Sequence, residues 1–211
     1  MKILKIGDKF AYKNEIYTVN RKGIFFVYVS KLTEEGYEDC RLNFFQVMFG
    51  MSDTLDIKAV EDFPSIMLSN FTGFDFVFRN IEMKSMEGFL QGLKYSDLEK
   101  QNKCFGYKGR KAKKFGCKTD WKKEQTLYFQ KHPIKRDSEE YQKILDEAYE
   151  ELYKNEEFRT YLDMTKGFVL THSIGKKDPE QTVLTEEEFV SRLMKLRDTG
   201  TLADIKNKEQ K

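Results

Sequence analysis

The spacing of apolar residues changes along this chain, and that change constrains the fold more than any other feature. Before about residue 60, Tyr, Phe, Val and Ile alternate or cluster between turn-forming pairs, over residues 9–20, 23–31 and 37–45. Such short runs predict a β-meander that forms a small sheet or an SH3-sized barrel. From Ser85 onward the apolar spacing becomes helical. We therefore predict an α+β fold, in which a small N-terminal β-meander precedes a mainly helical domain.

The domain boundaries follow from the same change in pattern. We expect a sheet-like region over residues 1–60, a helical domain over 61–198 and a flexible tail over 199–211. Residues 53–62 are expected to be a connector. No Gly/Ser-rich linker and no internal repeat separates the two folded parts. A chain of 211 residues is long enough for one sizeable core with a small satellite.

Several helix starts can be assigned from capping residues. Ser85 precedes a short helix with apolar residues at i, i+3, i+4 and i+7, and Thr185 with Glu188 forms a capping box. We expect further helices from Lys108 to Phe115, from an Asp120 cap to a point before Pro133, and from Ser138 onward.

Composition excludes several classes of protein. The cysteines Cys40, Cys104 and Cys117 are odd in number and show no Cys-x-x-Cys spacing, so neither a disulfide framework nor a zinc site is indicated. The sequence shows neither a leader-like opening nor an apolar run long enough to span a membrane. We therefore expect a cytoplasmic protein, in the host cytoplasm if the chain is viral. No P-loop, dinucleotide fingerprint or metal-ligand cluster is present, so we expect no cofactor and no metal.

Charge is distributed unevenly along the chain. The segment 108–123 carries eight basic residues against Asp120 alone: Lys108, Arg110, Lys111, Lys113, Lys114, Lys118, Lys122 and Lys123. Acidic residues dominate residues 137–157. A basic run with Tyr107, Phe115 and Trp121 interleaved suits a nucleic-acid backbone, although such a run is more commonly a solvated helix face.

Glu87 is the main candidate for chemistry. On the helix after Ser85, the stripe beside the apolar one contains Glu87, Gln91 and Lys94 at i, i+4 and i+7. In the first helical turn the helix dipole favours an ionised carboxylate, which suits a base or a stabiliser of positive charge. From spacing alone, the border of an ordinary packed face is the more common explanation of such a stripe.

Several motifs in order resemble the NADAR, or YbiA-like, family. They are Leu68-Ser69-Asn70-Phe71, Ser85 to Lys94 with Glu87, Gly109 to Gly116 with Ala112-Lys113, and Asp120-Trp121. The resemblance runs from about Pro64 to Arg197. It departs at Gly88-Phe89, where many relatives have His and an aromatic residue. It also departs in the segment from Leu170 to Gly175, with Asp178 and Thr182, which resembles the family's final active-site segment but lacks a Trp-Gly pair.

The resemblance implies a mostly helical N-glycosidase that acts on ribosylated or ADP-ribosylated compounds. Some members cleave a ribosylamine of the riboflavin pathway, and others remove ADP-ribose from guanine in DNA, reversing DarT-type toxins as antitoxins or in phages. Glu87 would stabilise positive charge at the ribose C1 or activate water. The other residues of the resembling motifs that we expect in catalysis or substrate binding are Asn70, Phe71, Gln91, Lys94, Lys113, Trp121, His172, Asp178 and Thr182. Apart from the resemblance, Arg110 of the basic run could hold a phosphate bidentately.

Some of these residues have a structural alternative. Trp121 is as consistent with a core anchor as with a ring that stacks on a base. His172 can orient a hydroxyl or transfer a proton near neutral pH, or it can be an ordinary loop histidine. Asp178, before Pro179, is either a second active-site carboxylate or a turn former.

The leading hypothesis is an N-glycosidase that acts on ADP-ribosylated guanine in DNA. The alternatives are a metabolic N-glycosidase acting on a phosphorylated ribosylamine, and a non-catalytic module that binds ADP-ribose or nucleic acid. The sequence leaves the oligomeric state open.

Overall fold

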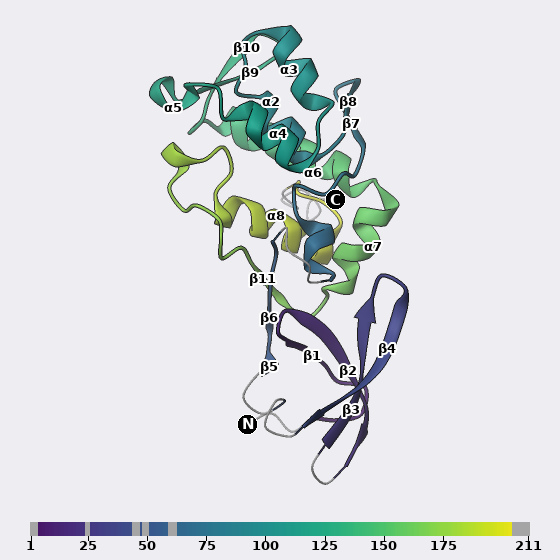
Figure 1. Ribbon diagram of the computed structural model, residues 1–211. Helices are drawn as coiled ribbons and strands as arrows, with labels where there is room; N and C mark the ends of the chain where they lie inside the picture. Colours follow the sequence, from purple (N-terminus) through teal and green to yellow (C-terminus); the bar gives the residue numbers. More distant parts are fainter. Residues whose placement is uncertain (1–3, 24–25, 44–46, 48–50, 59–62, 204–211) are drawn as a thin grey trace, which may run out of the picture. The chain divides into compact units, whose positions relative to one another are not determined.

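The chain folds into two compact units in the computed structural model shown in Figure 1. The structure describes residues 4–23, 26–43, 47, 51–58 and 63–203. One unit comprises Met1–Ser69 with Tyr161–Ile174, and the other comprises Asn70–Thr160 with Gly175–Lys211. Strands dominate the first and helices the second, so the predicted α+β class is confirmed. The predicted division at residues 60 and 198 stays a prediction.

The first unit is built on an antiparallel sheet with strand order β4-β3-β2-β1-β5. Its strands are β1 (Lys9–Tyr12), β2 (Glu15–Lys22), β3 (Phe26–Thr33), β4 (Gly36–Asn43) and β5 (Met51–Ser52). The predicted meander is confirmed, and residues 44–45 of its last predicted strand lie outside the described residues. The buried core of the sheet consists of Phe10, Tyr17, Val19, Val27, Val29, Leu42 and Val47.

A parallel strand pair completes this unit, since β6 (Thr54–Asp56) pairs with β11 (Val169–Thr171). The expected connector over residues 53–62 therefore contains a strand, and residues 59–62 lie outside the description. Burial would raise the pKa of Asp56, but hydrogen bonds from Ser173 and the charge of Lys58 outweigh burial and lower it. A short 3-10 helix, η1 (Ser65–Leu68), also belongs to this unit.

The second unit contains most of the helices. They are α2 (Met86–Gly92), α3 (Leu98–Phe105), α4 (Gly109–Gly116), α5 (Trp121–Glu124), α6 (Glu139–Tyr153) and α8 (Glu186–Thr199), and α7 (Glu156–Met164) leads into the first unit. The predicted caps Ser85, Ser138 and Thr185 are confirmed, because each side chain accepts a backbone N–H of the first turn. In the described part of the chain, no helix has the length and apolar content needed to cross a membrane.

The helix predicted from Asp120 toward Pro133 is wrong. Helix α5 ends after one turn, since Gln125 adopts a left-handed conformation with φ of 48°. The chain then forms a hairpin of β9 (Thr126–Phe129) and β10 (His132–Lys135). Its two turn residues, Gln130 and Lys131, also have positive φ, as a tight hairpin turn requires. A similar hairpin joins β7 (Phe76–Phe78) to β8 (Ile81–Met83).

Helix α2 is fixed by close backbone contact and by aromatic packing. A Cβ atom on Gly88 would lie 2.5 Å from the carbonyl oxygen of Tyr107 and 3.0 Å from that of Cys104. The Ser85 hydroxyl donates to the same Tyr107 carbonyl at 3.0 Å. Phe89 packs edge-on against Phe78 with ring centroids 5.0 Å apart. The start of α2 is therefore tied to the segment that joins α3 to α4.

A buried ion pair joins Arg136, the residue after β10, to α8. The guanidinium of Arg136 is 2% exposed and donates two hydrogen bonds to the Glu188 carboxylate, at 3.0 and 2.6 Å. Burial would raise the pKa of Glu188, but hydrogen bonds from Arg136, the Thr185 backbone and Gln142 outweigh it and lower the pKa below 4.5. The pair therefore stabilises the fold while Glu188 is ionised.

Replacing Gly88 by Ala tests the close contact of α2. Alanine favours a helix, but its methyl group would press on backbone carbonyls that cannot rotate away, so we expect a loss of about 1–3 kcal/mol in the free energy of unfolding. Urea unfolding followed by circular dichroism measures it. Gly106→Ala is the matched control, because the nearest atom to its Cβ is 3.6 Å away. Equal stability of the two variants would contradict the contact.

Replacing Glu188 by Gln tests the ion pair. The change leaves the buried charge of Arg136 uncompensated, so we expect a loss of about 3 kcal/mol near neutral pH. The wild-type advantage is complete above pH 4.5 and declines as the pH falls through the lowered pKa of Glu188. Urea unfolding across this range measures both. The exposed neighbour Glu187→Gln should behave like the wild type, and a pH-independent difference would refute the role of Glu188.

Candidate functional site

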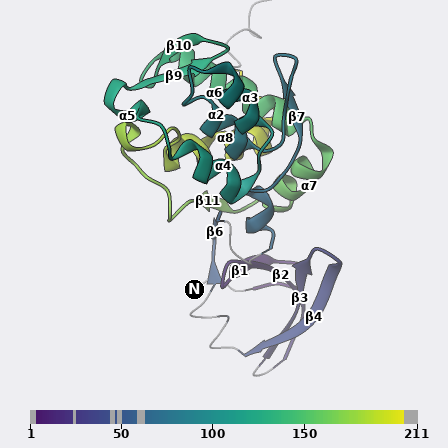
Figure 2. The same cartoon turned by 45° about the horizontal axis from the view of Figure 1, so that its top comes forward.

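Glu87 lies on a helix that is buried all round. All seven residues of α2 are buried, and Glu87 and Gln91 are 5% and 1% exposed. Helix α2 contacts α3, α4, α6 and β8, and Figure 2 shows it among these helices. The stripe that the sequence places at the border of the packed face is thus enclosed. A buried carboxylate is costly unless it is hydrogen-bonded or paired.

The loop before β7 supports the start of α2. The backbone N–H of Glu87 donates to the carbonyl of Asn70 at 2.9 Å. The Asn70 side chain in turn accepts a 3.0 Å hydrogen bond from the hydroxyl of Tyr149, which lies fully buried on α6. Phe71 follows, and its carbonyl oxygen lies 3.2 Å from a Cβ built on Gly109, the first residue of α4. The predicted residues Asn70 and Phe71 therefore connect α2 with α6 and α4.

The carboxylate of Glu87 is only partly paired. Its Oε1 accepts a hydrogen bond from the amide of Gln91 at 2.8 Å and lies 3.5 Å from Nζ of Lys113. Its Oε2 has no hydrogen-bond partner among the described residues. The Glu87 side chain as a whole is 6% exposed. One carboxylate oxygen is therefore held in place, and the other makes no hydrogen bond within the described residues.

Gln91 links Glu87 to a second lysine. Its Oε1 accepts a hydrogen bond from Nζ of Lys94 at 2.5 Å, while its amide nitrogen serves Glu87. The side chain of Gln91 fills the space above Gly116 of α4, where a Cβ would lie 2.1 Å from the amide oxygen. The absence of a side chain at Gly116 thus allows the amide to adopt this position.

Lys94 is partly buried beside these groups. Burial and the neighbouring charge of Lys113 lower the pKa of Lys94 to about 8, although Glu87 opposes the shift. Its ammonium lies 5.7 Å from the ring centre of Trp121, which is 6% exposed. Buried in this way, Trp121 has little free ring surface for stacking on a base. The site contains one carboxylate and two lysines, and the pKa of one of these lysines, Lys94, is lowered to about 8.

The remaining predicted residues make local contacts of their own. His172 belongs to the first unit, where its Nδ1 is hydrogen-bonded to the carbonyl of Ile57. Asp178 is exposed and caps the 3-10 helix η2 (Pro179–Gln181) by accepting the N–H of Glu180 at 2.9 Å. Thr182 ends η2 and donates to the carbonyl of Leu184. These contacts fit the structural alternatives, a hydrogen-bonded loop histidine for His172 and a turn former for Asp178. The catalytic roles of both residues stay predictions.

Arg110 is exposed in the first turn of α4. It lies on the same helix as Lys113, three positions earlier. Among the described residues, no group of His, Cys, Asp or Glu side chains is placed to hold a metal ion.

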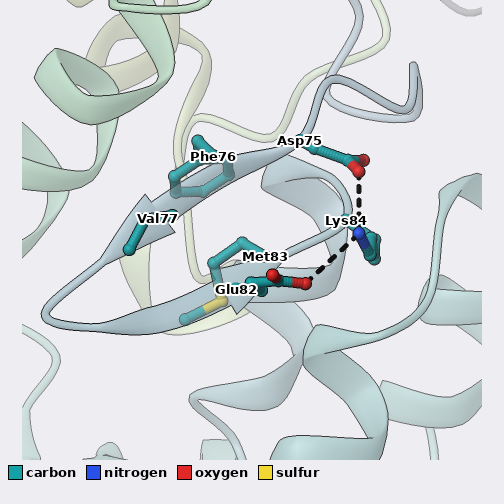
Figure 3. Close-up of a pocket in the computed structure, with 6 residues that line it drawn as sticks. All are labelled: Asp75, Phe76, Val77, Glu82, Met83 and Lys84. Carbon is teal, nitrogen blue, oxygen red and sulfur yellow. Dashed lines mark hydrogen bonds and ion pairs between the residues drawn. The ribbon is translucent and has the colours of Figure 1, made fainter.

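A shallow cavity of about 170 Å³ lies on the β7–β8 hairpin, as Figure 3 shows. It is lined by Asp75, Phe76, Val77, Glu82, Met83 and Lys84. The ammonium of Lys84 bridges Asp75 at 2.8 Å and Glu82 at 3.4 Å across it. Because these three polar groups satisfy one another and none of the predicted site residues lines the cavity, we assign it no role.

Sequence reasoning missed two residues that build the site. Tyr149 lies on the inward face of α6. A tyrosine on an apolar stripe indicates that its hydroxyl needs a buried hydrogen-bond acceptor, which here is Asn70. Gly116 follows the last residue of the helix predicted over Lys108 to Phe115, and nothing in the sequence shows that it makes room for Gln91. Such a contact depends on how two helices pack.

Comparison with known proteins gives one family. The model of the family described as Bacteriophage protein GP30.3 matches residues 62–198. The chain is also similar to an uncharacterized 17.1 kDa protein of the Gp30–rIII intergenic region of Enterobacteria phage T4, at 36% identity over 148 residues, which cover 69% of this chain and 97% of the relative. No solved structure matches. The expected membership of the NADAR family is therefore wrong.

The pH dependence of stability tests the environment of Lys94. Because its pKa is lowered to about 8 from 10.5, the unfolded state binds more protons between these values, and stability should rise with pH across them. In Lys94→Met this contribution is absent. The difference in free energy of unfolding between wild type and variant, measured with urea, should therefore increase in favour of the wild type from pH 8 to 10.5. A constant difference would refute the lowered pKa.

Proposed function

We propose that this chain, which belongs to the bacteriophage protein GP30.3 family, is an N-glycosidase with Glu87 as its catalytic carboxylate. The proposed reaction is hydrolysis of a ribosyl C1–N bond, and the proposed substrate is ADP-ribosylated guanine. The observation that carries the proposal is the carboxylate of Glu87, whose Oε1 is held by Gln91 while its Oε2 has no hydrogen-bond partner among the described residues. The names of the family and of the phage T4 relative state no activity, so the proposal rests on this geometry.

A fixed carboxylate fits the chemistry of this bond. When the C1–N bond breaks, positive charge develops on the ribose, and an anion held beside C1 lowers the energy of that state. Water adds its hydroxyl to C1 and its proton goes to the departing nitrogen, so one water is consumed for each bond. Glu87 can stabilise the charge, activate the water, or do both. Because Gln91 already fixes Oε1, the carboxylate need not reorganise during the reaction.

The two lysines fit an anionic substrate. Lys94 and Lys113 flank the Glu87–Gln91 pair, and ADP-ribose carries two phosphates that ammonium groups can bind. A phosphorylated ribosylamine, with a single phosphate, is the second candidate, because one of the two lysines would suffice to bind it. A reaction on host or phage nucleotides would take place in the cytoplasm of the infected cell.

Replacing Glu87 by Gln tests the role of the carboxylate. Gln has almost the same shape but no charge, so we expect release of ADP-ribose from a modified oligonucleotide to fall at least about 100-fold. Release is measured by chromatography with purified protein. Glu99→Gln, an exposed glutamate at the start of α3, is the matched control and should keep full activity.

Equal release by the wild type and Glu87→Gln would refute the assignment of Glu87. If the wild type releases nothing from the oligonucleotide but cleaves a phosphorylated ribosylamine, the second substrate replaces the first. Binding of ADP-ribose without cleavage of either substrate would refute the enzyme and favour a binding module.

A further inference from the structure

Every fully exposed residue of α4 is cationic. The helix reads Gly-Arg-Lys-Ala-Lys-Lys-Phe-Gly, with Gly109, Ala112 and Gly116 buried and Phe115 half-buried. At 100° per residue, the buried positions fall on one side, and the basic residues cover the other. The α4 basic face consists of Arg110, Lys111, Lys113 and Lys114, flanked by the exposed Lys108 and Lys118.

This face lacks the acidic partners of an ordinary solvated helix. Within the described residues, its ion pairs are those of Lys108 with Asp75 and Lys113 with Glu87, while Arg110, Lys111 and Lys114 have no acidic partner. Like charges three and four positions apart destabilise a helix by a few tenths of a kcal/mol per pair. Without a bound anion, the face therefore keeps an unrelieved repulsion.

The basic face adjoins the candidate site. Lys113 belongs to it and lies 3.5 Å from Oε1 of Glu87, so a phosphate bound on α4 would be next to the carboxylate. Lys111 is positioned by packing over the ring of Tyr107 at 4.0 Å. The helix presents no exposed apolar residue that would enter a lipid surface, which argues against an anionic membrane as the partner.

We propose that the α4 basic face binds the phosphate backbone of a single DNA strand and so delivers a nucleotide of that strand to Glu87. The delivery step rests on the proposed function, whereas the binding of DNA does not. For this delivery the strand must be single, because the ADP-ribosylated guanine of a stacked, paired nucleotide is out of reach of Glu87. With Trp121 buried, base stacking adds little, so binding depends on phosphates, tolerates any sequence and weakens steeply with salt.

The experiment measures binding of an unmodified, labelled single-stranded oligonucleotide by fluorescence anisotropy at several salt concentrations. The variant replaces Arg110, Lys111 and Lys114 by Gln. Each lost phosphate contact reduces the slope of log affinity against log salt by about 0.7, so the slope should fall by about 2. Affinity at low salt should fall at least about tenfold. The control replaces the exposed Lys100, Lys131 and Lys143 by Gln and should bind like the wild type.

An unchanged slope in the α4 variant would overturn the proposal, and so would equally tight binding of poly-aspartate by the wild type. Circular dichroism verifies that both triple variants fold. Glu87→Gln separates the two proposals, because it should bind DNA with the full slope whatever its activity. DNA binding that depends on α4, without cleavage of any ribosyl substrate, would refute the enzyme alone. Cleavage with a slope independent of α4 would refute the basic face alone.

Discussion

The close approach of α2 to the end of α3 is the constraint on which the rest of the second unit depends. At Gly88 the backbone of α2 meets the carbonyls of Cys104 and Tyr107 at distances that exclude any side chain. The Ser85 hydroxyl, which caps α2, also donates to Tyr107. Tyr107 lies two residues before α4, so this contact ties the start of α2 to the start of α4. Glu87 on α2 and Lys113 on α4 can approach each other only because that contact is made.

Enclosure of α2 changes the character of its polar residues. An exposed Glu-Gln-Lys stripe would be mobile and screened by water, but here the Gln91 amide is held by Gly116, Glu87 and Lys94 at once. Low surrounding polarity strengthens each of these contacts and makes an incompletely paired carboxylate more costly. On the same helix, Phe89 packs against the rings of Phe78 and Phe105.

The sequence predicted those parts of the fold that local chemistry determines. Ser85, Ser138 and Thr185 each start a helix because a side-chain oxygen at that point satisfies a free N–H. The helix prediction after Asp120 was wrong because Gln125, Gln130 and Lys131 adopt left-handed conformations. Glycine or asparagine usually marks such positions in a sequence, and neither occurs at these three. In the candidate site, the spacing of Glu87, Gln91 and Lys94 was readable. The burial of that stripe and the contributions of Tyr149 and Gly116 depend on packing between distant segments, which a single sequence does not reveal.

The parallel pairing of β6 with β11 bears on how far the family domain is an independent module. The match to the GP30.3 family begins at residue 62, so it includes β11 but not its partner β6. A fragment cut at that boundary would lose the backbone partner of Leu170, and the hydrogen bonds from Ser173 to Asp56 would go with it. The boundary of sequence similarity therefore falls inside the first unit, between the two paired strands β6 and β11.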